Sequence, residues 1–194
     1  MLRDVGYTSA AFGKWDLAGH TQTDFEPELL PTGQGFNYFF GTPTSNDAFV
    51  NILRNEAVIE KQADLSMLTR WYTEEVIAFM KSNKDKPFFA YLAHTMPHVK
   101  LAVSEQFRGR SKRGLYGDVI EEIDWSVGQI LETIKDLGLD EYTYVIFTSD
   151  NGPWHVWGEF GGSAGPLRGA KASAWEGGFR VPCIMRAQVG YLPV

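Results

Sequence analysis

Residues 142–152, YTYVIFTSDNG, join a short apolar run to an acid, an amide and a glycine. A run of this length that is rich in β-branched and aromatic residues is typical of a strand. Apolar residues occupy both parities of the run, which is typical of a strand buried inside a parallel sheet. The sequence therefore predicts a buried strand at 142–148, with Asp150 and Asn151 directly beyond its carboxyl end.

The segments before this strand alternate between helical and strand patterns. Apolar residues recur at helical spacing over 116–137, and Gly138 supplies a C-terminal stop. The same spacing over 65–84 predicts another helix, and the apolar run at 87–93 predicts a strand covered on both faces. This order predicts an α/β fold with a mostly parallel sheet and helices on both faces.

Two long stretches lack a sustained period. Prolines and glycines interrupt residues 21–63, which are too many for an ordinary connection, so we expect an elaborated loop region near a site. Glycine is dense over 151–178, and this segment must adopt backbone conformations that other residues resist.

Composition limits the class of protein. The chain has 194 residues, of which 44% are hydrophobic, which suffices for one core, and one domain is the working count. A net charge of -6 without runs of like charge disfavours nucleic acid as a partner. No apolar run approaches the roughly 20 residues that cross a bilayer. The single cysteine, Cys183, excludes an internal disulfide and is expected to be a small buried hydrophobe.

Asp150 and Asn151 are the first candidates for chemistry. Ligands bind α/β sheets beyond the carboxyl ends of the strands, and both side chains offer the oxygen ligands that calcium prefers. An Asp-Asn-Gly sequence is also an ordinary turn, so the metal site and the turn both stay open.

Histidines and lysines supply further candidates. His94 and His98 follow the strand at 87–93, and a histidine there can donate to an anion or shuttle a proton. Their spacing would suit a zinc pair on a helix, but Pro97 between them breaks a helix. A loop histidine without function is the alternative.

Lys14 and Lys171 stand among glycines and small residues, where an anion can approach the backbone, although most lysines are only solvated.

Five stretches, taken in order, resemble motifs of the sulfatase family. They are 6–15 GYTSAAFGKW, 35–41 GFNYFFG, 97–99 PHV, 148–152 TSDNG and 165–182 GPLRGAKASAWEGGFRVP. The resemblance implies the alkaline-phosphatase-like α/β fold and calcium-dependent hydrolysis of sulfate esters. It implies that Asp150 and Asn151 bind calcium, and that Lys14, His98 and Lys171 are catalytic and substrate-binding residues that contact the sulfate. Such cations stabilise the negative oxygens of a transition state.

The chain departs from the family pattern in two respects. Asp16 stands where the family has a histidine, and a carboxylate does not offer the donor and acceptor of a neutral imidazole; His20 is a possible substitute. The family's C-x-P-S-R string, whose cysteine or serine matures to formylglycine, does not occur in these 194 residues. We therefore expect residues 1–194 to be a partial sulfatase catalytic domain, incomplete at both ends and inactive alone.

Two alternatives stay open at this point. The first is a phosphate-ester or phosphonate hydrolase on the same fold, since one fold hosts several chemistries. The second is a non-catalytic remnant that binds sulfated glycans. The resemblance implies a small-molecule or glycan sulfate ester as substrate and a periplasmic or extracellular location. Trp154 and Trp157 are candidates to stack on a sugar ring.

Overall fold

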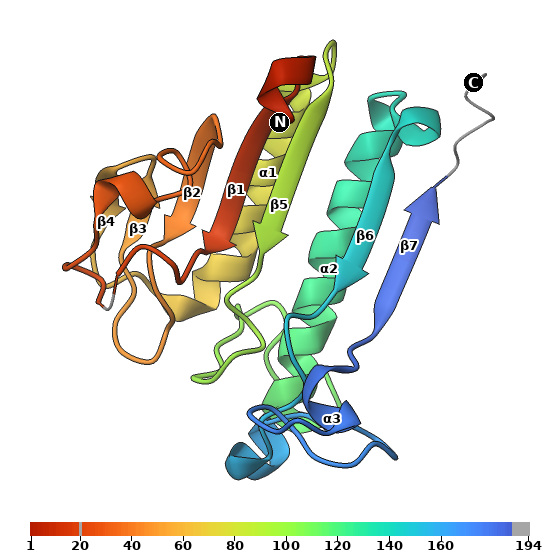
Figure 1. Cartoon of the computed structure of the whole chain (residues 1–194). Coiled ribbons are helices and arrows are strands. Elements are labelled where there is room, and N and C mark those ends of the chain that lie inside the picture. The colour runs from red at the N-terminus through yellow and green to blue at the C-terminus, as the bar shows by residue number, and fades with distance from the viewer. Residues whose placement is uncertain (20, 188–194) are drawn as a thin grey trace. The chain divides into compact units, whose positions relative to one another are not determined.

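The structure, a computed structural model, describes residues 1–19 and 21–187 (Figure 1). These residues form two compact units. The first is Met1–Thr133 and the second begins at Ile134. His20 lies outside the described residues. None of the described helices has the length and apolar character needed to cross a membrane.

The first unit is built on a mixed five-stranded sheet with the order β4–β3–β2–β1–β5. The strands are β1 (Thr8–Lys14), β2 (Tyr38–Thr42), β3 (Ile52–Arg54), β4 (Ala57–Glu60) and β5 (Phe88–Ala93). β1 lies between β2 and β5 and is parallel to both, while β3 and β4 add antiparallel strands at one edge. The predicted α/β sheet is confirmed, and its parallel core is β2–β1–β5.

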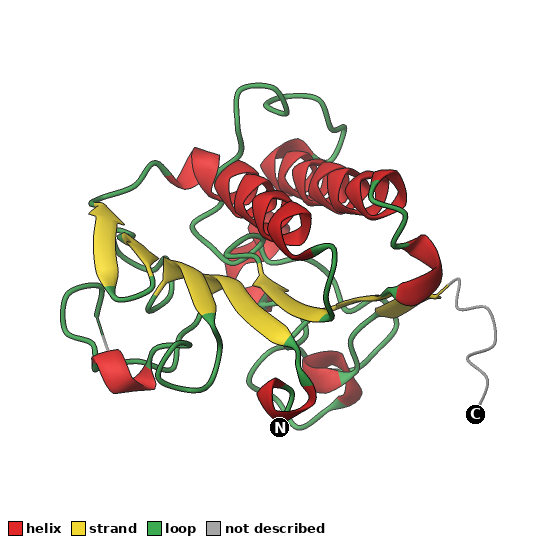
Figure 2. Cartoon of the chain, turned by 90° about the horizontal axis from the view of Figure 1, so that it is seen from above, coloured by secondary structure: helices red, strands yellow, loops and turns green. Residues whose placement is uncertain are grey.

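Helices form a layer on one face of this sheet (Figure 2). α1 (Leu68–Asn83) follows the 3-10 turn η3 (Leu65–Met67) and packs its Phe79 ring 5.7 Å from that of Phe12 on β1. α2 (Gly114–Asp136) is followed by Gly138, which adopts φ +69°. There the Leu139 N–H donates to the Ile134 carbonyl, as in a Schellman motif. Both predicted helices and the predicted stop are confirmed.

The other face of the sheet is covered differently. A cluster of Ala11, Phe39 and Leu53 is closed by Ala18 and Leu30, from the segment that holds η2 (Pro27–Leu29). The remaining short turn, η1 (Arg3–Val5), precedes β1. The elaborated loop region expected over 21–63 contains three short strands, β2, β3 and β4, which the sequence did not indicate. Their three to five residues are too few to establish a period.

The second unit contains a two-stranded antiparallel sheet. Its elements after α2 are η4 (Asp140–Tyr142), β6 (Tyr144–Thr148), η5 (His155–Phe160), α3 (Glu176–Phe179) and β7 (Cys183–Ala187). The predicted strand at 142–148 is confirmed as β6, but its predicted burial is wrong, because Ile146 is 60% exposed. Cys183, expected to be buried, is exposed as well. A sheet of two strands offers too little packing to bury both of its own faces.

β5 differs from its prediction in the same way. Phe88 packs on Phe79 of α1, but Phe89 and Tyr91 point to the opposite face and are 41% and 46% exposed. Phe36 stacks on Phe89 there without covering it. The prediction that β5 is covered on both faces is therefore wrong, because α1 buries one face only.

Candidate functional site

Lys14 and His98 lie at the same edge of the first unit's sheet. In the strand register, Lys14 is opposite Thr42 at the end of β2, and Gly13 is opposite Ala93 at the end of β5. His98 lies in the loop that follows β5. The structure thus brings both predicted residues to the carboxyl edge of parallel strands, where α/β proteins bind ligands.

The backbone at Lys14 is set by a close approach of three strands. A Cβ on Gly13, whose φ is +93°, would lie 1.9 Å from the Ala93 carbonyl oxygen, and a Cβ on Gly41 would lie 1.9 Å from the Gly13 oxygen. Only glycine fits at these positions. Trp15 then donates its indole N–H to the Leu29 carbonyl at 2.8 Å, which fixes the chain directly after Lys14.

Lys14 already has a negatively charged neighbour. Its Nζ lies 3.4 Å from Oδ2 of Asp16, and its side chain is only 18% exposed. Asp16 adopts a left-handed φ of +61°, which is uncommon for a residue other than glycine. Asp16, at the position where the family motif has a histidine, therefore forms an ion pair with Lys14.

His98 is bound to the buried side chain of Asn46. Its Nδ1 lies 3.0 Å from the Asn46 Oδ1, while the Asn46 amide nitrogen donates to the carbonyls of His98 and Lys100 at 3.2 and 3.1 Å. Asn46 is 0% exposed and follows β2. Sequence reasoning missed this residue, and no pattern around it signals a partner for His98.

His94 has a different environment from His98. Its Nε2 lies 3.2 Å from the Ser126 hydroxyl, and its ring packs near Tyr72. Complete burial lowers the pKa of His94 to about 4, because the charged form loses its solvation. Its Nδ1 has no hydrogen-bond partner among residues 1–19 and 21–187. His94 is therefore a neutral core residue at physiological pH.

In the second unit, Asp150 and Asn151 directly follow β6, as predicted. Asp150 is exposed, and the amide nitrogen of Asn151 donates to its carboxylate. The next residue, Gly152, donates its N–H to the Gly178 carbonyl at 2.9 Å, and a Cβ on it would lie 1.8 Å from the Gly177 oxygen. The acid–amide turn is thus held against the Gly-Gly pair of α3.

Lys171 belongs to the same group of loops. Its backbone N–H donates to the Pro153 carbonyl at 2.9 Å, and its Nζ lies 5.1 Å from the centre of the Trp154 ring. Gly158, Gly162, Gly165 and Gly169 take positive φ here, which confirms the conformations expected of the glycine-dense segment. The second unit therefore places Asp150, Asn151 and Lys171 in one loop cluster.

The donor chemistry at Asp150 and Asn151 fits calcium. Both residues present oxygen, and the Asn151 contact to Asp150 uses its nitrogen, not its amide oxygen. Calcium takes about six to eight oxygen ligands, so these two would supply part of a set. No group of three or more His, Cys, Asp or Glu side chains able to hold a metal occurs within the part of the chain that the structure describes.

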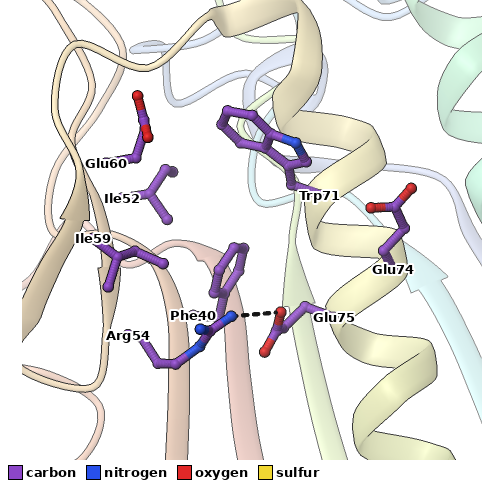
Figure 3. A pocket seen from close by; sticks show the side chains of 8 residues that line it. All are labelled: Phe40, Ile52, Arg54, Ile59, Glu60, Trp71, Glu74 and Glu75. Atoms are coloured by element: carbon purple, nitrogen blue, oxygen red, sulfur yellow. Dashed lines mark hydrogen bonds and ion pairs between the residues drawn. The ribbon is translucent and has the colours of Figure 1, made fainter.

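A hollow of about 270 Å³ lies elsewhere in the first unit (Figure 3). It opens between α1 and strands β2, β3 and β4, and none of the predicted site residues lines it. On its wall Arg54 pairs with Glu75 at 3.1 Å and donates to the Tyr38 hydroxyl at 2.9 Å. These contacts tie α1 to the sheet.

The fold and the strand-end residues define an α/β protein of the alkaline-phosphatase-like class, which solved sulfatase structures share. The PsFucS1 sulfatase from Pseudoalteromonas sp. superposes with a TM-score of 0.81 at 26% identity, over 96% of this chain and 44% of that one. Ps i-CgsB, solved in complex with k-i-k-neocarrahexaose, superposes with a TM-score of 0.79 at 25% identity, over 96% and 46%.

The family model described as Sulfatase matches residues 1–193, and the chain belongs to the sulfatase family. It is 37% identical to the N-acetylgalactosamine-6-sulfatase of Mus musculus, over 95% of its own length and 38% of the relative's. It is 31% identical to the steryl-sulfatase of Homo sapiens, over 96% and 45%. The chain thus spans less than half the length of these relatives.

Proposed function

We propose that residues 1–194 are part of a catalytic domain that hydrolyses sulfate esters. Lys14, His98 and Lys171 contact the sulfate group, and Asp150 and Asn151 bind calcium. The observation that carries the proposal is the position of the five family motifs, whose polar residues lie at strand ends and in the loops beyond them in both units. Family membership supports the reaction class.

Each residue has a chemical role in this proposal. The ammonium groups of Lys14 and Lys171 stabilise the negative charge that develops on the sulfate oxygens. His98 binds the sulfate and transfers a proton through its ring. Calcium, when held by the oxygens of Asp150 and Asn151, supplies Lewis-acid polarisation of the sulfate.

The proposed substrate is a sulfated sugar. Ps i-CgsB was solved with a carbohydrate, and another structural neighbour was solved with D-glucosamine-2-N,6-O-disulfate. In this chain Trp154 and Trp157 lie with their ring centres 6.2 Å apart in the loop after Asp150 and Asn151, and aromatic faces of this kind stack on sugar rings. We also propose an extracellular or periplasmic location, as the family resemblance implies.

The test begins with the reading frame upstream of Met1, which is expected to encode a C-x-P-S-R string. The protein extended through that string is then assayed on an aryl sulfate and an aryl phosphate. Turnover of the sulfate should dominate, and Lys171→Ala should lower kcat/KM by about a hundredfold, as for loss of one oxyanion donor. Preferential turnover of the phosphate would support the alternative hydrolase. Absence of turnover on the aryl sulfate, the aryl phosphate and a sulfated sugar would overturn hydrolysis and favour a binding remnant.

A further inference from the structure

We propose that Asn46 is a positioning residue that holds the His98 imidazole in its Nδ1–H tautomer. The Nε2 atom is then the ring nitrogen that gains or loses the proton. The assignment of the tautomer follows from contacts within the first unit. Its use against a sulfate group rests on the proposed function above.

The orientation of the Asn46 side chain is fixed by two backbone carbonyls. One terminal atom of the amide lies 3.2 Å from the His98 carbonyl oxygen and 3.1 Å from the Lys100 carbonyl oxygen. Carbonyl oxygens only accept hydrogen bonds, so the atom between them must be the NH₂ group, which has two protons to donate. The amide oxygen therefore faces the His98 ring.

The orientation of Asn46 determines where the His98 proton lies. The Asn46 Oδ1 has no proton to give, and it lies 3.0 Å from Nδ1 of His98. A hydrogen bond across this distance requires Nδ1 to carry hydrogen. The neutral imidazole then has its lone pair on Nε2, and the imidazolium adds its proton there. A second group thus decides which nitrogen of a histidine is active.

Burial makes the reversed orientation of the Asn46 amide unfavourable. Asn46 is 0% exposed, so a flipped amide would place its oxygen against two backbone carbonyl oxygens, which would then lose their donor. One side chain thereby joins the loop after β2 to the loop after β5 and orients the ring between them. The orientation and the tautomer of the His98 ring are therefore fixed before any ligand binds.

His94 provides an internal reference with the opposite tautomer. Thr73 gives its hydroxyl proton to the Thr69 carbonyl at 2.6 Å, so Ser126 must donate to Thr73, also at 2.6 Å. The Ser126 oxygen can then only accept from His94, which requires hydrogen on Nε2. The two histidines of one loop are therefore expected to differ in tautomer.

The experiment is a long-range ¹H–¹⁵N correlation spectrum of the ¹⁵N-labelled chain at a pH where both histidines are neutral. His98→Gln and His94→Gln variants assign the two rings. We expect a protonated Nδ1 for His98 and a protonated Nε2 for His94 in the same spectrum. A protonated Nε2 on neutral His98 in the unmodified chain would overturn the proposal, and this result needs no variant at position 46.

Two asparagine variants then test the cause. Asn46→Ala removes the acceptor at Nδ1, so the share of the Nδ1–H tautomer of His98 should fall. Asn37→Ala removes an asparagine that accepts from the Ser9 N–H at the opposite end of β2, and it should leave His98 unchanged. An unchanged tautomer in a folded Asn46→Ala variant, judged by unchanged amide signals from β1, would show that Asn46 does not set it.

These readouts do not depend on sulfatase activity. If His98 shows the expected tautomer but the extended protein turns over no sulfate ester, the proposed function fails and the role of Asn46 stands. If sulfate esters are hydrolysed while His98 carries its proton on Nε2, the role of Asn46 fails and the proposed function stands.

Discussion

Asp16 lies beside Lys14, the lysine proposed to contact sulfate, and this ion pair gives the first prediction. Replacing Asp16 with Asn removes the competing charge and keeps a residue that tolerates the left-handed backbone. Sulfate should bind the chain more tightly by up to about fivefold, since an ion pair whose carboxylate is half-exposed contributes about 1 kcal/mol or less. Titration of the labelled chain with sodium sulfate, followed by NMR, measures the change.

Lys14→Gln is the matched control for that titration. It should weaken the response of the β1 and β2 amides to sulfate in either background. Equal sulfate affinity in the Asp16→Asn variant and the unmodified chain would show that the carboxylate does not compete for Lys14.

Burial of His94 predicts a loss of stability in mild acid. Its pKa is about 4 when folded and 6.5 in the unfolded reference, so the unfolded chain binds more protons between these values. The stability contributed by the neutral ring is complete above pH 6.5, and about 3 kcal/mol of it is lost as the pH falls to 4.

Urea unfolding at pH 7 and pH 4.5 measures this loss. Carboxylates also titrate in the window, so the unmodified chain is compared with a His94→Gln variant, whose amide can still donate to Ser126. The difference between the two pH values should be smaller in the variant. An equal pH dependence in both proteins would show that His94 is not the group responsible.

Single residues differed in how far the sequence could predict them. His98, Asp150 and Asn151 follow strands that have a readable apolar pattern, and the structure finds them beyond strand ends. Lys14 was selected from its glycine-rich surroundings, and the structure places it at the end of β1. Asn46 could not be predicted, because its role depends on a contact across 52 positions of sequence. Their catalytic and metal-binding roles stay predictions.

At the scale of elements, the close approach of three strands gives the next prediction. Gly13→Ala should destabilise the first unit by more than about 3 kcal/mol, because the added Cβ meets the Ala93 backbone and the site has positive φ. Gly35 has a similar φ of +103° with nothing within 4 Å of its Cβ position. Gly35→Ala should therefore cost only about 1 kcal/mol.

Thermal or urea unfolding of the two glycine variants separates steric contact from backbone conformation. Similar destabilisation in both would show that the strands can move apart at Gly13. A much larger effect at Gly13 would also explain why the residue before Lys14 has to be glycine.

Element length decided which parts of the fold were predictable. α1 and α2 run for 16 and 23 residues, so their helical spacing repeats several times. β3 and β4 have three and four residues, and their positions depend on pairing with β2, which sequence spacing does not encode. The burial of β5 and β6 was overestimated because an apolar composition does not say what covers a strand.

The division into two units leads to a prediction for the whole molecule. β6 and β7 form a two-stranded sheet with exposed side chains, whereas β1 is flanked by strands on both sides and is buried. Amide protons in β6 and β7 should exchange with solvent at least about tenfold faster than those of β1, because isolated two-stranded sheets are marginally stable. Hydrogen–deuterium exchange by NMR measures this. Equal protection would show that the second unit is as stable as the first.

The ammonium group of Lys171 lies 5.1 Å from the centre of the Trp154 ring, and this contact should affect tryptophan fluorescence. A cation over an indole face alters the emission of that indole, and an anion that draws the lysine away should reverse the effect. A change in Trp154 emission on addition of sulfate would therefore report sulfate binding at Lys171, and Lys171→Met should abolish that change.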